Sequence, residues 1–154
     1  DTRKTTPGLR ALEKYAVRIG GGNNHRYNLG DGILIKDNHI KAMRFQGLCL
    51  VDILRKARSN FPNGMKIQVE VESLEEVREA LDGGADALLL DNMGLDSLQK
   101  AVNLVNGRLT LEASGGINID NVRNVAATGV DFISIGAITH SKRSVDISLD
   151  LYES

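Results

Sequence analysis

Short apolar segments that end in a polar residue or glycine recur along the second half of the chain at a nearly constant interval. Glu70, Asp91, Glu112 and Gly136 end four of these segments, and the intervals between them are 21, 21 and 24 residues. Each interval also holds apolar residues at helical spacing. Strands that alternate with helices at this period form right-handed parallel βαβ units, so the spacing predicts an α/β fold around a parallel sheet.

Individual segments carry the signals of strands and helices. Residues 66–72 alternate apolar and polar side chains and are rich in valine, which is typical of a strand. Ser73 and Glu76 then form a capping-box pattern, which indicates the start of a helix. We predict strands at residues 32–36, 66–72, 87–91, 109–112 and 132–136, and helices at residues 7–19, 50–61, 74–82, 95–105, 119–126 and 145–152.

The first predicted helix has an apolar and a polar face. Leu9, Leu12 and Ala16 share one side of it, so this side is expected to pack on the core. Arg10 and Lys14 are expected to be solvated residues of the same helix.

The composition excludes several classes of protein. Forty-two per cent of the residues are hydrophobic and the net charge is only −1, which argues against disorder. Apolar runs such as residues 87–90 are too short to span a membrane. The single cysteine, Cys49, excludes a disulfide framework and indicates a reducing, cytoplasmic compartment; we expect its side chain in the core. A length of 154 residues fits one domain.

Charge is divided unevenly along the chain. Residues 1–60 carry 12 Lys and Arg against 5 Asp and Glu, whereas residues 61–154 carry 7 against 15. A nucleic-acid-binding arm is disfavoured, because the basic residues are scattered and lack an aromatic stacking platform. Two interpretations remain: two differently solvated faces, or a site where basic side chains hold an anionic substrate and carboxylates hold a metal.

The predicted strand ends converge on one edge of the sheet, where parallel α/β folds place their active sites. Glu70, Asp91 and Glu112 are therefore expected around one rim, where three carboxylates repel one another unless a cation compensates them. Oxygen ligands of this kind favour magnesium. Because charged strand ends converge, we prefer an incomplete TIM-like parallel β/α barrel over the alternative, an open doubly wound sheet.

Basic residues and glycine loops supply candidate anion sites. The basic cluster consists of Arg3, Lys4, Arg10, His25, Arg26 and Lys36. Arginine forks suit planar carboxylates and phosphates. Residues 114–116 follow one strand and Gly136 the next, at positions where barrels commonly bind phosphate, and His140 is close enough in sequence to contact it. No nucleophile motif is visible, and the spacing of the histidines argues against zinc.

Eight motifs occur in order along the chain. They are DTRKTTPGLR at residues 1–10, EKYAV at 13–17, GGGNNHR at 20–26, LIKDNH at 34–39, VEVE at 69–72, LDN at 90–92, EASGG at 112–116 and GAITH at 136–140. In this respect the chain resembles the quinolinate phosphoribosyltransferase family (nicotinate-nucleotide pyrophosphorylase, carboxylating). The resemblance spans essentially all of its length, which makes it far more specific than any single motif.

The resemblance implies a reaction and a set of residue roles. Phosphoribosyl pyrophosphate and quinolinate would give nicotinate mononucleotide, pyrophosphate and carbon dioxide, in NAD biosynthesis, with magnesium as cofactor. The implied roles are Arg3, His25, Arg26 and Lys36 for the quinolinate carboxylates, Lys4 and Lys36 for the pyrophosphate, Glu70 and Asp91 for the ribose hydroxyls and magnesium, and Ser114, Gly115, Gly136 and His140 for the phosphate. Lys36, Glu70 and Asp91 are the expected catalytic residues.

The resemblance also implies a domain organisation. Residues 1–154 are expected to be the catalytic barrel domain, a fragment without the family's N-terminal domain and without an arginine that reaches the site from a neighbouring subunit. The complete enzyme is expected to be a homodimer or a higher homo-oligomer. Two alternatives stay open: a related pyridine phosphoribosyltransferase with another substrate, and a non-catalytic α/β domain that binds anions.

Overall fold

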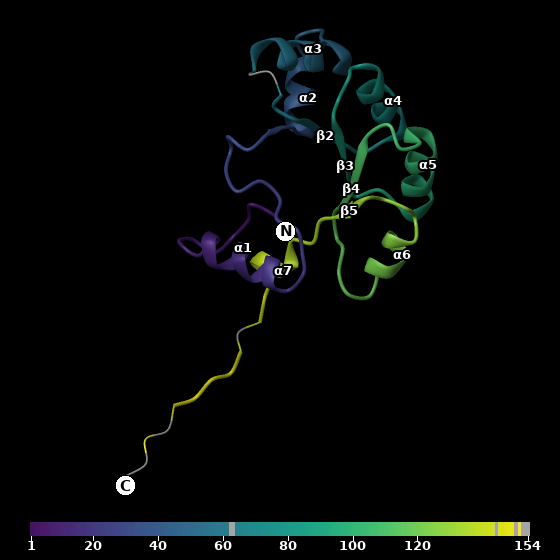
Figure 1. Cartoon of the computed structure of the whole chain (residues 1–154). Coiled ribbons are helices and arrows are strands. Elements are labelled where there is room, and N and C mark those ends of the chain that lie inside the picture. The colour runs from purple at the N-terminus through teal and green to yellow at the C-terminus, as the bar shows by residue number, and fades with distance from the viewer. Residues whose placement is uncertain (62–63, 144, 150, 152–154) are drawn as a thin grey trace.

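A five-stranded parallel sheet forms the centre of the computed structural model, which describes residues 1–61, 64–143, 145–149 and 151 (Figure 1). The strands are β1 (Ile33–Ile35), β2 (Ile67–Val71), β3 (Ala87–Asp91), β4 (Thr110–Ser114) and β5 (Phe132–Ile133). The helices are α1 (Arg10–Ile19), α2 (Asp37–Arg44), α3 (Leu50–Asn60), α4 (Leu74–Asp82), α5 (Leu95–Val105), α6 (Val122–Ala126) and α7 (Ala137–His140). In the described part of the chain, no helix is both long and apolar enough to cross a membrane.

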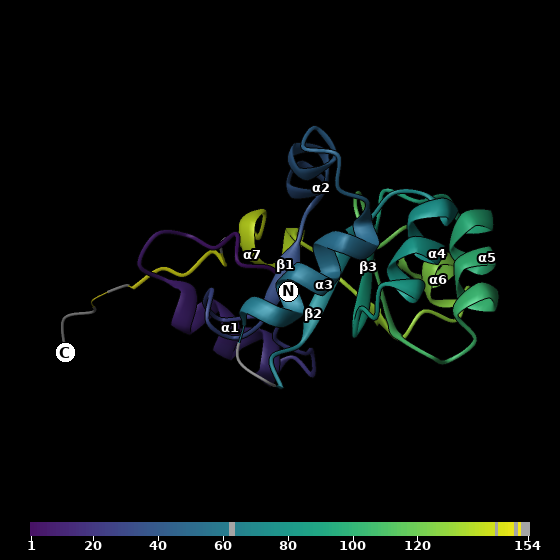
Figure 2. The same cartoon turned by 90° about the horizontal axis from the view of Figure 1, so that it is seen from above.

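The strands lie side by side in the order in which they follow one another along the chain, and every neighbouring pair is parallel. A doubly wound sheet would instead reverse its strand order and carry helices on both faces. Here the strand order is not reversed, and α3, α4, α5 and α6 form an arc along one face, whereas α1 and α7 lie apart from that arc and contact each other (Figure 1, Figure 2). The arrangement confirms the predicted α/β class and the incomplete barrel.

Alternation along the strands separates an outer face, covered by helices, from an inner face. In β2, Ile67, Val69 and Val71 are buried in the apolar core between the sheet and the helices. Gln68 and Glu70, which alternate with them, point to the inner face. The inner face is therefore where the polar side chains of the strands gather.

Aspartates lock the starts of neighbouring strands together at two places. Asp86 Oδ2 accepts a hydrogen bond of 2.7 Å from Ile67 N, at the start of β2, while Asp86 N donates to Ile67 O at 2.9 Å. Asp131 makes the same pair of contacts with Leu111 in β4, at 2.7 and 3.0 Å. Both aspartates end a Gly-Xaa-Asp sequence just before their strand. Asp86 thus fixes the register of β3 against β2, and Asp131 fixes that of β5 against β4.

Helix α1 forms where it is predicted, but the prediction of its buried face is wrong. Leu12 is 66% exposed and Leu9 is exposed as well, whereas Glu13 and Lys14 are buried. The reason is that the two charged side chains have partners in other segments, so they are buried without being left unpaired. Glu13, for example, accepts hydrogen bonds from the backbone N–H of Thr6.

Lys14 is one half of a buried ion pair. Its Nζ donates to both carboxylate oxygens of Asp1, at 2.9 and 3.0 Å, and to the carbonyl of His25 at 2.9 Å. The same carboxylate accepts the backbone N–H of His25 at 2.6 Å. The predicted solvated position of Lys14 is therefore wrong, and burial lowers the pKa of its ammonium group.

Three further predictions are wrong. Arg10 is not a free surface residue, because its guanidinium donates to the carbonyls of Arg3 and Tyr27 at 3.2 and 3.3 Å. Cys49 is exposed at the N-cap of α3, where its thiol contacts Asp52. Residues 145–149 and 151 are exposed and not helical, while residues 150 and 152 of that predicted helix lie outside the described residues. Helices α2 and α7, both short, are absent from the prediction.

Replacing Lys14 with methionine tests the buried ion pair. The Lys14→Met variant keeps most of the side-chain volume but leaves the Asp1 carboxylate buried without its cation, so the free energy of unfolding is expected to fall by about 3–5 kcal/mol. Urea unfolding measures the change. The matched control is Lys56→Met on the exposed surface of α3, with an expected change within about 0.5 kcal/mol. Equal effects of the two substitutions would contradict the assignment.

Candidate active site

Two cavities lie on the inner face of the sheet, and Ser134 lines both. The strand-end cavity, of about 380 Å³, lies where the strands end and includes Lys4, Asp91, Ser114, Gly115, Gly136 and His140 in its lining. The inner cavity, of about 680 Å³, lies toward the strand starts and includes His25, Arg26, Gln68 and Glu112. Eight of the residues predicted for the site thus line one cavity or the other.

The other three predicted residues lie beside these cavities. Arg3 is close enough to Arg26 for its charge to lower the pKa of that guanidinium. Lys36 is the N-cap of α2, directly after β1. Glu70 lies on the inner face of β2, near both Lys36 and Asp91. All eleven predicted residues are therefore near the inner face or its strand-end edge.

Arg3 and Arg26 form an unusual pair of cations. The Nε atom of each is buried and has no hydrogen-bond partner among the described residues. Burial lowers the pKa of Arg26, and the charge of Arg3 lowers it further, yet guanidinium groups stay charged in proteins. Within the described part of the chain, Nη1 is the one guanidinium nitrogen of Arg26 that makes a hydrogen bond, to the carbonyl of Gly32 at 2.9 Å. Two adjacent cations with unused buried donors make a binding place for an anion.

Glu70 and Asp91 bring two carboxylates together at the ends of neighbouring strands. Burial raises the pKa of Glu70, the negative charge of Asp91 raises it further, and Lys36 acts in the opposite direction. The two carboxylates are thus incompletely compensated by the protein itself. A cation or the hydroxyl groups of a ligand would stabilise both of them ionised.

The donor set fits magnesium only when a ligand supplies part of its coordination. Among the residues that the structure describes, no three His, Cys, Asp or Glu side chains are grouped to hold a metal. Mg²⁺, however, commonly binds through one or two carboxylates together with water and substrate phosphates. Glu70 and Asp91 match that mode.

The loop after β4 passes against the loop after β3. Gly115 has a φ of +93°, and a Cβ built on it would lie 2.7 Å from the backbone nitrogen of Asn92. Asn92 itself has a φ of 53°, donates from its backbone to the carbonyl of Ser114 at 2.9 Å, and donates from its side chain to Asp91 at 2.7 Å. The close approach requires glycine at position 115 and holds the wall of the strand-end cavity in place.

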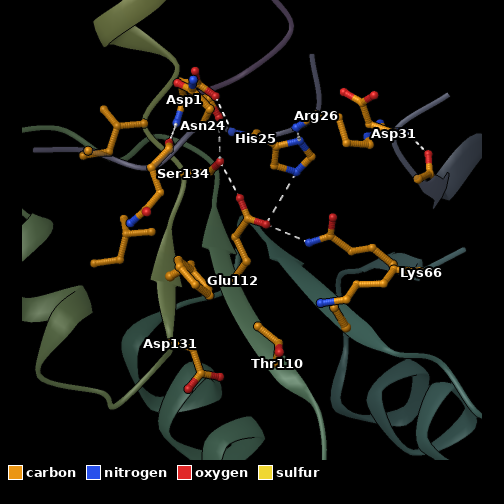
Figure 3. Close-up of a pocket in the computed structure, with 18 of the residues that line it drawn as sticks. Asp1, Asn24, His25, Arg26, Asp31, Lys66, Thr110, Glu112, Asp131 and Ser134 are labelled. Atoms are coloured by element: carbon orange, nitrogen blue, oxygen red, sulfur yellow. Dashed lines mark hydrogen bonds and ion pairs between the residues drawn. The ribbon is translucent and has the colours of Figure 1, made fainter. Parts of the chain in front are cut away.

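Glu112 lies deeper than predicted. It pairs in register with Leu89 rather than with Asp91, which lies opposite Ser114, so the expected rim of three carboxylates is wrong for Glu112. Its Oε2 accepts from Gln68 Nε2 at 2.7 Å and lies 3.6 Å from His25 Nε2. Its Oε1 lies 2.6 Å from the hydroxyl of Ser134, so that Glu112 is the centre of a polar network (Figure 3).

The electrostatics of Glu112 reflect this network. Burial by itself raises the pKa of the carboxyl group, but the contacts with His25, Ser134 and Gln68 outweigh it and hold the pKa below its usual value. Glu112 is thus a largely buried, ionised carboxylate. Sequence reasoning missed Gln68, Asn92 and Ser134 as parts of the site; the alternation of β2 was the one signal that placed Gln68 on the polar face.

Comparison with known proteins agrees with this geometry. Residues 1–150 match the family described as quinolinate phosphoribosyl transferase, C-terminal domain. The chain belongs to this family. It spans about half the length of the curated relatives that it matches.

Three relatives show the extent of the similarity. A probable nicotinate-nucleotide pyrophosphorylase [carboxylating] of Bacillus subtilis is 48% identical over 98% of this chain and 51% of its own length. A quinolinate phosphoribosyltransferase [decarboxylating] of Nicotiana tabacum, named as mitochondrial, is 42% identical over 98% of the chain and 47% of its own length. The crystal structure of nicotinate-nucleotide pyrophosphorylase from Ehrlichia chaffeensis superposes with a TM-score of 0.89 at 50% identity and covers 97% of this chain and 53% of that one.

Substituting Gly115 tests the contact between the two loops. Gly115→Ala places a methyl group against Asn92 and forces alanine into a left-handed conformation, so the free energy of unfolding is expected to fall by about 1–3 kcal/mol. Urea unfolding checks this value. Gly94→Ala is the control, because Gly94 has a φ of −68° and no atom within 4 Å of the added methyl group. A stable Gly115→Ala protein would show that the loops do not touch.

A pH series tests the environment of Glu70. Because its pKa is raised on folding, the folded chain holds the Glu70 proton more tightly than the unfolded chain, and stability falls as the pH rises through the folded-state pKa. Glu70→Gln is therefore expected to be more stable than the wild type at neutral pH, with the gap closing in acid. Urea unfolding at several pH values measures this gap. Glu75→Gln on the exposed side of α4 controls for removal of a surface charge; a gap for Glu70→Gln that is constant with pH would contradict the prediction.

Proposed function

We propose that this chain is the catalytic domain of an enzyme that transfers the phosphoribosyl group of phosphoribosyl pyrophosphate to quinolinate with loss of carbon dioxide. The observation that carries the proposal is the pair Arg3 and Arg26, whose buried Nε donors have no partner among the described residues. A planar dicarboxylate supplies the acceptors that such a pair lacks. Membership of the family and the names of its relatives support this choice of substrate.

In this proposal the basic residues bind the two carboxylates of quinolinate. Arg3, Arg26 and Lys36 supply the charges, with His25 beside Arg26. Lys4, at the strand-end cavity, and Lys36 face the pyrophosphate. A monocarboxylate such as nicotinate would need fewer cationic partners, which favours quinolinate over other pyridines.

The strand-end cavity accommodates the ribose phosphate. Ser114, Gly115, Gly136 and His140 surround the phosphate, because glycines there let backbone approach it closely; a Cβ on Gly136 would lie 2.5 Å from the His140 ring. Glu70 and Asp91 would contact the ribose hydroxyls and would hold the magnesium that accompanies the pyrophosphate. When bound, magnesium neutralises the charge of the leaving pyrophosphate.

The residues on the inner face then act by position and charge. Departure of pyrophosphate builds positive charge at the anomeric carbon, which Glu70 and Asp91 stabilise while Lys4 and Lys36 stabilise the leaving group. Attack by the pyridine nitrogen makes the ring cationic, so the electron pair left at C2 when the 2-carboxylate leaves as carbon dioxide is stabilised by the adjacent positive nitrogen, and C2 then takes a proton from water. No side chain needs to act as a nucleophile.

The wider setting belongs to the same proposal. We assign residues 1–154 to the catalytic barrel domain and expect the complete enzyme to work as a homodimer or a higher homo-oligomer. We place the reaction in the cytoplasm, since the single cysteine, Cys49, is a free thiol. The tobacco relative, in contrast, is named as mitochondrial, so the cytoplasmic location needs a test of its own.

Carbon dioxide release from labelled quinolinate, with phosphoribosyl pyrophosphate and Mg²⁺, tests the function in the complete protein that carries this chain. Nicotinate mononucleotide is the expected product, and nicotinate in place of quinolinate is expected to give none. Product from nicotinate alone would identify a different pyridine phosphoribosyltransferase. Binding of quinolinate without turnover would instead support an anion-binding domain.

Arg3→Ala tests the residue that matters most to this proposal. Loss of charged hydrogen bonds is expected to raise KM for quinolinate about 10- to 100-fold. Steady-state kinetics at saturating phosphoribosyl pyrophosphate gives the value. Arg18→Ala, on the exposed last turn of α1, is the control and is expected to leave KM unchanged. An unaltered KM for Arg3→Ala would remove Arg3 from the quinolinate site.

A further inference from the structure

Both ring nitrogens of His25 face groups of the protein, Nδ1 in a hydrogen bond and Nε2 in a longer contact. Nδ1 accepts a hydrogen bond of 2.8 Å from the backbone N–H of Arg26. An accepting Nδ1 carries no proton, so in the neutral ring the proton is on Nε2. Nε2 lies 3.6 Å from Oε2 of Glu112, which is the acceptor that this N–H faces (Figure 3). The ring therefore joins the carboxylate of Glu112 to the backbone of Arg26.

Glu112 is held rigidly enough to orient that ring. Its side chain is 12% exposed, and Gln68 from β2 and Ser134, just beyond β5, fix its two oxygens from opposite sides. The backbone of His25 is held independently, because its N–H donates to Asp1 and its carbonyl accepts from Lys14. With its backbone held, His25 can still rotate its ring, and Glu112 faces the ring nitrogen Nε2.

Arg26 is the residue that gains from this arrangement. Its backbone N–H donates to the ring of His25, and its guanidinium donates to the carbonyl of Gly32, its one hydrogen bond to the residues that the structure describes. Its Nε stays buried without a partner among the described residues, beside Arg3. Arg26 lies beside the positive charge of Arg3, so its guanidinium has to be held in place against the repulsion between the two cations.

We propose that Glu112 is a positioning residue for the carboxylate-binding Arg26, acting through the Nε2–H tautomer of His25. The proposal rests on the proposed function, and it gives His25 the role of a link rather than of a direct ligand. It requires an acceptor at position 112, not a particular charge. Glutamine can keep an oxygen toward Gln68 and His25 and turn its amide to Ser134, whereas leucine offers no acceptor.

Kinetics of two variants in the complete protein separate an acceptor from a charge. Glu112→Leu is expected to raise KM for quinolinate about tenfold, with KM for phosphoribosyl pyrophosphate within about twofold of the wild type, because the His25 ring loses the acceptor that faces its Nε2–H and an effect of about this size follows the loss of one polar contact to a charged group. Glu112→Gln is expected to restore KM for quinolinate to near the wild-type value. An unchanged KM in folded Glu112→Leu, or a glutamine variant as impaired as the leucine one, would overturn the proposal.

Nitrogen NMR of the histidine rings gives a readout that needs no activity. In the wild type, the His25 signals, assigned by their loss in His25→Gln, are expected to show a protonated Nε2 and an unprotonated Nδ1 at about pH 8. Ser134→Ala, which removes one partner of Glu112 but not the acceptor of His25, is expected to keep that tautomer. A protonated Nδ1 in the wild type would overturn the proposal even where Glu112→Leu fails to fold. A wild type that forms no nicotinate mononucleotide would refute the proposed function instead, whatever the tautomer.

Discussion

The carboxylate of Asp1 is the interaction on which the candidate site depends. It is buried, and it accepts from Lys14, from the backbone of His25 and from the amide of Asn24 oriented with its nitrogen toward it. A buried carboxylate that loses a partner strongly destabilises the fold, so the three partners of Asp1 are held at fixed places. Arg3 lies two residues beyond Asp1 and Arg26 directly follows His25. The same carboxylate therefore brings two mutually repelling cations together.

The uneven charge along the chain becomes an arrangement in space. Basic residues from the first 36 positions and carboxylates from β2, β3 and β4 meet on the inner face of one sheet. Glu112 contributes negative charge close to Arg26 and His25, while Glu70 and Asp91 lie nearer the strand ends. These carboxylates differ in their neighbours. Hydrogen bonds stabilise the carboxylate of Glu112, whereas Glu70 and Asp91 repel each other.

Sequence patterns predict the elements here better than their surroundings. The period-two alternation of β2 and the cap at Ser73 are local effects, and both are confirmed. The buried side of α1 depends on partners outside the helix, since Lys14 pairs with Asp1 and Glu13 pairs with Lys142, and no helical periodicity reveals them. Glu112 is predicted at the end of its strand, but β4 continues two residues further to Ser114, and residue spacing does not show where a strand stops. The strand-end residues cluster as predicted, since parallel strands bring their ends to one edge.

The aspartates at the strand starts affect how the sheet is assembled. Asp86 and Asp131 each join a strand to the one that precedes it in the chain, so alignment of each new strand needs only contacts made within the last few tens of residues. Slippage by one residue would break both hydrogen bonds and turn the polar side chains into the core. At β2–β3 and β4–β5 the later strand can thus be aligned on the earlier one without help from the rest of the sheet.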